Sequence, residues 1–417
     1  MTESQKTQTQ RNWSVPETEV VQRVHQRLEA DGSDVLATIV DVDGNAYRRP
    51  GAKMLLDDAG DGVGSITAGC LEDDILRAAE SVRGTGQPEL VTYDLMDDDD
   101  DVWGLGVGCN GIIEVLLEPL TPSYRSATDA FTEGRDVAVL TVLSVHGEDV
   151  DASDTDSPLA YGDRAYYHPG EDRLSTPSDD DGASGDGGET TEADWPIDVL
   201  SEPASELAGR GRANVIDLEV DGTRLEVFVD GIAAPAELVV FGSGHDVGPV
   251  TELASKNDFR VTVVGFRGAV DLAERFPDAD RTVTTSPGTI EDDLEMGLDD
   301  RTYAVVMTHN FVDDRLAVET LLDAGVPYVG LMGPHERFEE MIEEFDAEER
   351  TITDDDRSSL YTPIGLDLGG GSPYQIAHSI VAEVLAVHND RDPRHLRARE
   401  GHIHDRIEVE ADPTPPK

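Results

Sequence analysis

The chain of 417 residues is poor in cysteine, aromatic side chains, basic residues and long apolar runs. Its two cysteines cannot by themselves complete a four-ligand zinc site, so we expect neither a permanent metal site nor a disulfide framework. No apolar run approaches the ~18 residues that a membrane span needs. The first 16 residues lack the apolar centre of a secretory signal. These absences predict a cytoplasmic protein without a membrane span.

Basic residues are outnumbered, with 32 Lys and Arg against 88 Asp and Glu and a net charge of −56. One interpretation is a disordered acidic protein, and the other is a folded, halophilic protein in which salt screens the repulsion between carboxylates. The regular apolar strands favour the folded, halophilic interpretation. Either way, binding to nucleic acid or to an anionic membrane surface is disfavoured.

The pattern of apolar and polar residues divides the chain into four parts, which we expect at residues 13–146, 147–235, 236–390 and 391–417. The first combines an amphipathic helix at 13–30 with strands, which indicates a mixed α+β domain. The second is an acidic, low-complexity insert followed by a β-hairpin with an Asp-Gly turn. The third alternates strands with helices, and the last resembles a solvated tail.

Each cysteine of the first part lies in a glycine-rich segment, Cys70 within 62–72 and Cys109 within 104–111. Cys70 is expected at a helix N-terminus, a location that favours the thiolate over the thiol. The two thiols are therefore candidates for handling sulfur or a metal. The alternative is that both are small core residues in tight turns.

A local basic cluster stands out in a chain that otherwise avoids cations: Tyr47, Arg48, Arg49 and Lys53. Arg48 and Arg49 are candidates for binding an anionic cofactor. The alternative is that this cluster pairs with the surplus acids of the chain itself.

The third part opens on the segment Leu238-Val-Val-Phe-Gly-Ser-Gly-His-Asp-Val-Gly248, an apolar strand followed by a glycine-rich turn and a helix. Glycines let backbone N–H groups approach an anion, and the helix N-terminus favours negative charge. The candidate phosphate-binding residues are Gly242, Ser243, Gly244, His245 and Gly248. The pattern G-x-G-x-x-G is displaced, because Val247 takes the third glycine position. The alternative is a tight turn without a ligand.

The strand–helix alternation predicts a Rossmann-like, doubly wound parallel sheet with strands at 237–242, 260–266, 281–285, 303–309 and 327–332. The second strand normally ends in an acid that binds a ribose hydroxyl, but here it ends in Gly265-Phe-Arg267. Arg267 would suit a phosphate instead. His309 and Asn310 follow the fourth strand, at the sheet edge where ligands of such folds bind.

These motifs together resemble the XdhC/CoxI family of xanthine dehydrogenase accessory proteins. The resemblance covers most of the chain, and no single motif carries it alone. It rests on segments that occur in order: 44–54, 64–72, 103–111, 241–245, 307–310, 330–333 and 363–369.

Membership of that family implies an accessory and maturation role for a molybdenum hydroxylase of the xanthine or carbon monoxide dehydrogenase type. The cofactor would be molybdenum cofactor, as molybdopterin or a dinucleotide form, which the protein binds, helps to sulfurate and inserts into the apo-enzyme. A cysteine desulfurase would supply the sulfur, and a homodimer is expected. The resemblance favours a cofactor-binding chaperone over a catalyst. The alternative function is an NAD(P)-dependent oxidoreductase, which the third part taken alone would suit.

Overall fold

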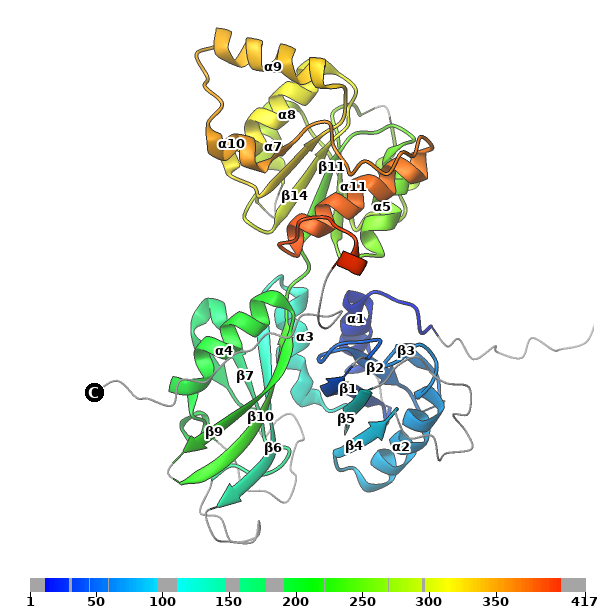
Figure 1. The fold of residues 1–417 in the computed structure, drawn as a ribbon, viewed down its shortest axis with the longest axis vertical. Helices are drawn as coiled ribbons and strands as arrows, with labels where there is room; N and C mark the ends of the chain where they lie inside the picture. The colour runs from blue at the N-terminus through cyan, green and yellow to red at the C-terminus, as the bar shows by residue number, and fades with distance from the viewer. Residues whose placement is uncertain are drawn as a thin grey trace, which may run out of the picture. The chain divides into compact units, whose positions relative to one another are not determined.

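The computed structural model describes residues 12–29, 32–44, 46–58, 60–95, 111–147, 158–177, 191–220, 222–268, 270–294 and 297–398. The chain forms two compact units, and the boundary falls between Ala234 and Pro235 (Figure 1). We call the part before this boundary unit 1 and the part from Pro235 onward unit 2.

Unit 1 contains two five-stranded antiparallel sheets, named here sheet A and sheet B. Sheet A has the order β3-β2-β1-β5-β4 and sheet B the order β8-β7-β6-β10-β9. The strands of sheet A are β1 (Val35–Gly44), β2 (Lys53–Leu56), β3 (Gly62–Gly64), β4 (Glu89–Asp94) and β5 (Gly111–Pro119). Those of sheet B are β6 (Val137–Gly147), β7 (Arg164–His168), β8 (Arg173–Ser175), β9 (Ala213–Val220) and β10 (Thr223–Ile232).

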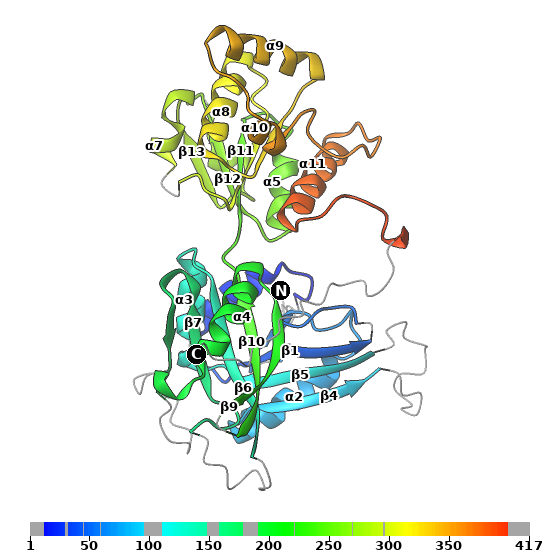
Figure 2. The same cartoon turned by 60° about the vertical axis from the view of Figure 1, so that its left-hand side comes forward.

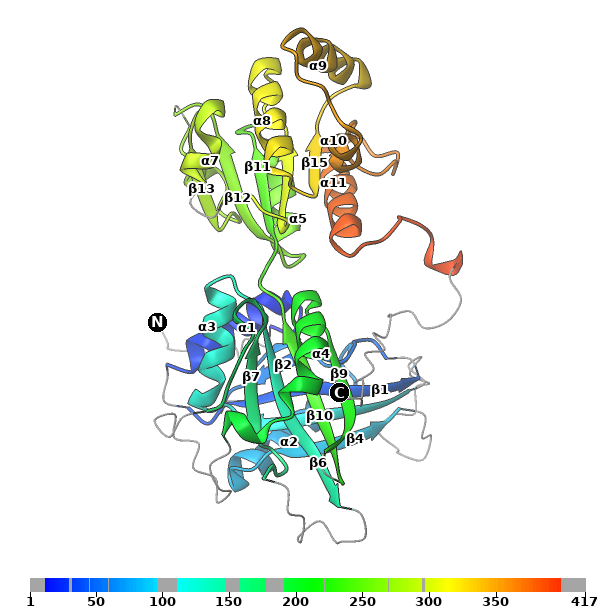
Figure 3. The same ribbon diagram turned by 90° about the vertical axis from the view of Figure 1, so that its left-hand side faces the viewer.

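Four helices complete unit 1: α1 (Glu17–Arg27), α2 (Glu72–Thr85), α3 (Arg125–Thr132) and α4 (Ile197–Arg210). Helix α2 packs on the outer face of sheet A through Ile75, Ala79 and Val82. Helix α4 covers sheet B through Leu200, Ala204 and Leu207, among others (Figure 3). The inner faces of both sheets share cores with each other and with α1 and α3. Both faces of the central strands are therefore buried, as in the first six residues of β1.

The predicted hairpin is present, because β9 and β10 pair with Val220 opposite Thr223 across a two-residue turn. It is built into sheet B, where β10 also pairs along its whole length with β6. The described part of residues 147–235 thus supplies four strands of sheet B and its covering helix.

Unit 2 is built on one six-stranded sheet, sheet C, whose strands are all parallel. The strand order β13-β12-β11-β14-β15-β16 is the 3-2-1-4-5-6 order of dinucleotide-binding folds. Its strands are β11 (Glu237–Phe241), β12 (Arg260–Gly265), β13 (Arg281–Thr284), β14 (Thr302–Val306), β15 (Tyr328–Leu331) and β16 (Leu360–Tyr361). The predicted fold class, a mixed α+β part followed by a Rossmann-like doubly wound sheet, is confirmed.

Helices cover both faces of sheet C (Figure 2). On one face lie α5 (Val247–Ser255), α6 (Leu272–Arg275) and α11 (Pro373–His388). On the other lie α7 (Ile290–Asp293), α8 (Phe311–Ala324) and α9 (His335–Ala347), and α10 (Asp354–Ser359) precedes β16. Helix α11 begins with a capping box formed by Ser372 and Gln375.

Candidate functional site: the carboxyl edge of sheet C

The loop after β11 lies close against the end of β14. A Cβ atom placed on Gly242 would come within 2.9 Å of the Met307 carbonyl oxygen. Only glycine fits there without a backbone shift. Gly248 has open space around it, so it does not serve close packing of the helix against the sheet. Val247 is fully buried and packs in the core at that level, which accounts for the displaced glycine pattern.

Helix α5 begins at Val247, and Asp246 is its N-cap residue. Its carboxylate makes no capping hydrogen bond. The third helical residue is Pro249, which has no N–H to donate, so the usual capping partner is missing. One oxygen of Asp246 lies over Gly244 instead, where it fills the space that a Cβ of that residue would need.

The second strand ends in glycine where the usual ribose-binding acid would stand. A Cβ at Gly265 would lie 3.0 Å from the side chain of Leu272. Arg267 follows, is 65% exposed, and donates to Asp313 at 3.0 Å. Arg275 donates to the carbonyl oxygen of Ser243 at 2.7 Å, so this arginine lies beside the glycine loop.

The loop after β14 brings His309 to the glycine loop. His309 Nε2 lies 2.8 Å from Asp246 Oδ2. His309 has a φ of +61°, an uncommon conformation for a residue with a side chain. The side-chain oxygen of Asn310 accepts from the Asp313 N–H and caps α8. Of the two predicted residues after this strand, only His309 has its side chain on the glycine loop.

A buried ion pair lies next to the carboxyl edge of sheet C. Asp314 is fully buried and accepts from Thr308 and from Arg337, which comes from the first turn of α9. Burial raises the pKa of Asp314, while the Thr308 hydrogen bond and the charge of Arg337 act in the opposite direction. The pair ties the starts of α8 and α9 together at the ends of β14 and β15.

The sequence reasoning missed Asp246, Arg275, Asp314 and Arg337 as parts of this site. The usable signal was composition, since each arginine is notable in a chain with 32 basic residues. Asp246 was visible as an extra polar residue within the glycine pattern. The positions of Arg275 and Arg337 depend on how helices pack, which a strand–helix pattern does not specify.

In unit 1 the Cys70 loop is tightly hydrogen-bonded. The hydroxyl of Thr67 accepts from the N–H groups of Gly69, Cys70 and Leu71. The buried carboxylate of Glu72 accepts from Thr67 and Leu71 in turn. Cys70 is half-buried with a free thiol and directly precedes the N-cap of α2. Cys109 lies outside the described residues.

The basic cluster of the sequence is paired with acids and carbonyls of unit 1. Arg48 donates to Glu17 and lies 3.4 Å from the Ser65 hydroxyl, which places it near the start of the Cys70 loop. Lys53 is buried and pairs with Asp230 at 2.8 Å. Arg49 donates to the Gly211 carbonyl oxygen. These contacts favour the structural alternative for Lys53, and they leave the anion-binding prediction for Arg48 and Arg49 untested.

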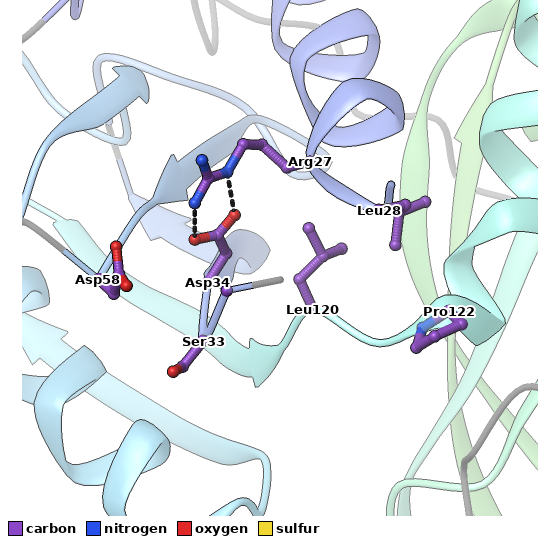
Figure 4. A pocket seen from close by; sticks show the side chains of 8 residues that line it. Arg27, Leu28, Ser33, Asp34, Asp58, Leu120 and Pro122 are labelled. Carbon is purple, nitrogen blue, oxygen red and sulfur yellow. Dashed lines mark hydrogen bonds and ion pairs between the residues drawn. The ribbon is translucent and has the colours of Figure 1, made fainter. Parts of the chain in front are cut away.

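A separate pocket of about 490 Å³ opens in unit 1 beside the end of α1. Its polar wall carries a two-bond ion pair between Arg27 and Asp34, at 2.5 and 2.8 Å (Figure 4). Leu28, Leu120 and Pro122 form an apolar wall opposite. The Arg27 charge in this pocket is already matched by the buried carboxylate of Asp34, and Asp58 adds a further carboxylate to the lining.

The described part of the chain shows neither a metal-binding cluster nor a membrane-spanning helix. It contains no cluster of three or more His, Cys, Asp or Glu side chains that could hold a metal ion. No helix among those residues is long and apolar enough to cross a membrane.

The strand order, the close glycine loop and the polar groups at the carboxyl ends of β11 and β14 define a nucleotide-type Rossmann domain. Comparison with known families makes the assignment specific. The XdhC Rossmann domain matches residues 238–384, and the XdhC and CoxI family matches residues 27–94. The chain belongs to the XdhC and CoxI family.

Similar proteins match over most of the chain. A probable xanthine dehydrogenase subunit from Bacillus subtilis is 27% identical over 362 residues, which is 86% of this chain and 94% of that protein. A crystal structure of a xanthine dehydrogenase from Bacillus halodurans superposes with a TM-score of 0.67 at 27% identity, covering 90% and 96% of the two chains. The uncharacterized protein YqeB of Escherichia coli is 24% identical over 170 residues, 40% of this chain and 30% of its own.

Proposed function

We propose that this protein is an accessory factor in the maturation of a molybdenum hydroxylase of the xanthine dehydrogenase type. The family assignment supports the accessory role, and the names of two relatives point to xanthine dehydrogenase. We propose further that the protein carries molybdenum cofactor as cargo and acts in the cytoplasm at high salt.

The observation that carries the proposal is the glycine loop on a 3-2-1-4-5-6 sheet. Gly242 brings the backbone close to the end of β14, and the loop leads directly into the N-terminus of α5. Such a loop suits the phosphate of molybdopterin or the diphosphate of a dinucleotide form. Arg275 adds positive charge beside the loop, and Arg267 follows the neighbouring strand β12.

The thiol of Cys70 supplies a second element of the proposal. It is free, half-buried and held at the start of α2 by the Thr67 turn. We propose that Cys70, together with Cys109, handles the sulfur that a cysteine desulfurase delivers for the cargo. Soft thiolate ligands suit a soft metal–sulfur centre.

The proposal is tested by purifying the protein from cells that make molybdenum cofactor and assaying bound pterin and molybdenum. We expect both in the wild-type protein and in Gly248→Ala, where the new methyl group meets open space. We expect loss of bound pterin in Gly242→Ala, because its Cβ would lie 2.9 Å from the Met307 carbonyl. Circular dichroism checks that both variants are folded. A folded wild-type protein without pterin or molybdenum overturns the cargo proposal.

A second arm separates carrying from sulfuration. Cys70→Ser and Cys109→Ser should retain pterin but fail to restore activity to the apo-hydroxylase when each is supplied as the purified, loaded protein. Full activation by both variants would remove the thiols from the proposal. Tight NADPH binding with turnover of a small substrate would favour the oxidoreductase alternative.

A further inference from the structure

One carboxylate occupies the inner side of the glycine loop. Asp246 Oδ1 lies against Gly244, and Asp246 Oδ2 lies 2.8 Å from His309 Nε2. The side chain is 29% exposed and makes no capping bond to α5, where Pro249 offers no N–H. A ligand phosphate approaching this loop would meet the Asp246 carboxylate first.

The histidine that holds this carboxylate comes from another strand. His309 ends the loop after β14, and Asp246 ends the loop after β11. These two strands are neighbours at the point where the strand order reverses, which is where ligands of this fold bind. His309 is 54% exposed and has the positive φ noted above. A residue kept in such a conformation is a reason to look for a role at the site.

The charges around the pair come from three further elements. Asp314 on α8 is close enough for the charge of His309 to lower its pKa slightly, and Arg337 on α9 neutralises Asp314. Asp313 on α8 is paired with Arg267 from the loop after β12. Among these charged groups, Asp246 is the carboxylate that lies on the glycine loop itself and depends on His309 for its partner.

We infer that Asp246 is a built-in competitor for the phosphate site and that His309 sets how strongly it competes. The inference rests on the proposed function and deepens it by naming what controls ligand entry. The ligand class is a diphosphate-bearing nucleotide or pterin. Binding requires the carboxylate to leave Gly244, after which His309 donates to the incoming phosphate.

The test uses inorganic pyrophosphate as the probe, with isothermal titration calorimetry of the full chain at pH 8. Asp246→Asn keeps the shape and removes the charge, so it should bind pyrophosphate about tenfold more tightly than wild type. His309→Gln removes the partner of Asp246 and the proposed donor to the phosphate, so it should bind pyrophosphate more weakly than wild type.

Asp300→Asn is the matched control. It removes one exposed carboxylate just before β14, at the opposite end of the strand from His309. Its affinity should stay within about twofold of wild type, since screening limits the reach of a surface charge. Equal affinities of wild type and Asp246→Asn at pH 8, or a weaker variant, would overturn the competition.

Failure of the inference and failure of the proposed function give different results. If the wild type and Asp246→Asn bind pyrophosphate alike while the wild type still carries pterin, the inference alone is wrong. If neither protein binds pyrophosphate and the wild type carries no pterin, the phosphate loop itself is overturned. Pyrophosphate binding with the predicted variant order supports the inference even where no pterin is recovered.

Discussion

The two units place their scarce cations differently. In unit 1 two ion pairs are buried between the sheets: Lys53 of β2 with Asp230 of β10, and Arg164 of β7 with Glu118 of β5. In unit 2 the arginines at the carboxyl edge pair with residues of α8 instead: Arg267, 65% exposed, with Asp313, and Arg337 with the buried Asp314. The comparison separates charges that hold two sheets together from charges that lie at a candidate ligand site.

The architecture explains this difference. Sheet C is covered by helices on both faces, so its polar side chains are left to the loops at the strand ends. Sheets A and B face each other, so a charge on an inner face is desolvated and must be paired. Basic side chains therefore have a structural role between the sheets of unit 1 and a candidate binding role at the carboxyl edge of sheet C.

The largest predicted effect is on the buried pair of unit 1. Lys53→Met leaves Asp230 buried without its cation and should lower the free energy of unfolding by about 3–5 kcal/mol. All three tryptophans precede residue 196, so tryptophan fluorescence during urea unfolding reports unit 1. The double variant Lys53→Met with Asp230→Leu should recover most of the loss. A single variant as stable as wild type would mean that the pair does not join the sheets.

A second comparison concerns glycines that pack against different neighbours. In unit 1 a Cβ on Gly231 would overlap the Leu207 carbonyl group of α4, so Gly231→Ala must displace a helix backbone. We expect a cost of about 1–3 kcal/mol or more in urea unfolding. Gly265→Ala in unit 2 meets only the flexible side chain of Leu272 and should cost less. The reverse order would contradict the packing described for α4.

Each unit also has a histidine whose pKa is lowered by desolvation: the buried His168 in unit 1, and His388 in unit 2, whose ring packs against Phe259 and Tyr303. At pH values between the lowered pKa and the ordinary histidine pKa, the unfolded chain therefore binds more protons than the folded chain. Stability should therefore fall as pH falls from 7 towards 5. His168→Gln should flatten this dependence in tryptophan fluorescence, and His388→Gln should flatten it in far-UV circular dichroism. An unchanged pH slope in both variants would exclude these histidines as the source.

The smallest effect is expected at an ion pair that is exposed instead of buried. Arg224 and Asp217 lie on the paired strands β10 and β9, and both are 61% exposed. Arg224→Ala should change the free energy of unfolding by less than about 1 kcal/mol, because water and salt screen exposed pairs. A cost comparable with that of Lys53→Met would remove the distinction between buried and exposed pairs in unit 1.

The sequence was most informative where one physical pattern determined the structure. Five of the six strands of sheet C were predicted close to their observed bounds, because short apolar runs that alternate with helical patterns indicate buried parallel strands. Strand β16 was missed because it has two residues and no pattern of its own. Helix α4 was missed, and its internal Pro203 is a signal against a helix. Helix α9 did carry a readable signal in Phe338, Met341 and Phe345.

The candidate site was predicted in position but not in detail. The glycine loop and His309 follow from the rule that ligands bind at the carboxyl ends of strands. The contact between His309 and Asp246 joins residues 63 positions apart and depends on loop conformations that composition does not encode. The role of Asn310 as a helix cap and the fit of Arg275 against Ser243 have the same origin.

The outermost strands of sheet C affect how readily the protein aggregates. One of them, β16, is two residues long, and the other, β13, reads Arg-Thr-Val-Thr and is half-exposed. Short or polar outer strands give a neighbouring molecule little backbone to pair with. A net charge of −56 repels neighbours in dilute buffer, but in molar salt that repulsion reaches only about 3 Å. In molar salt, the protection of sheet C against edge-to-edge pairing therefore depends on these two strands more than on charge.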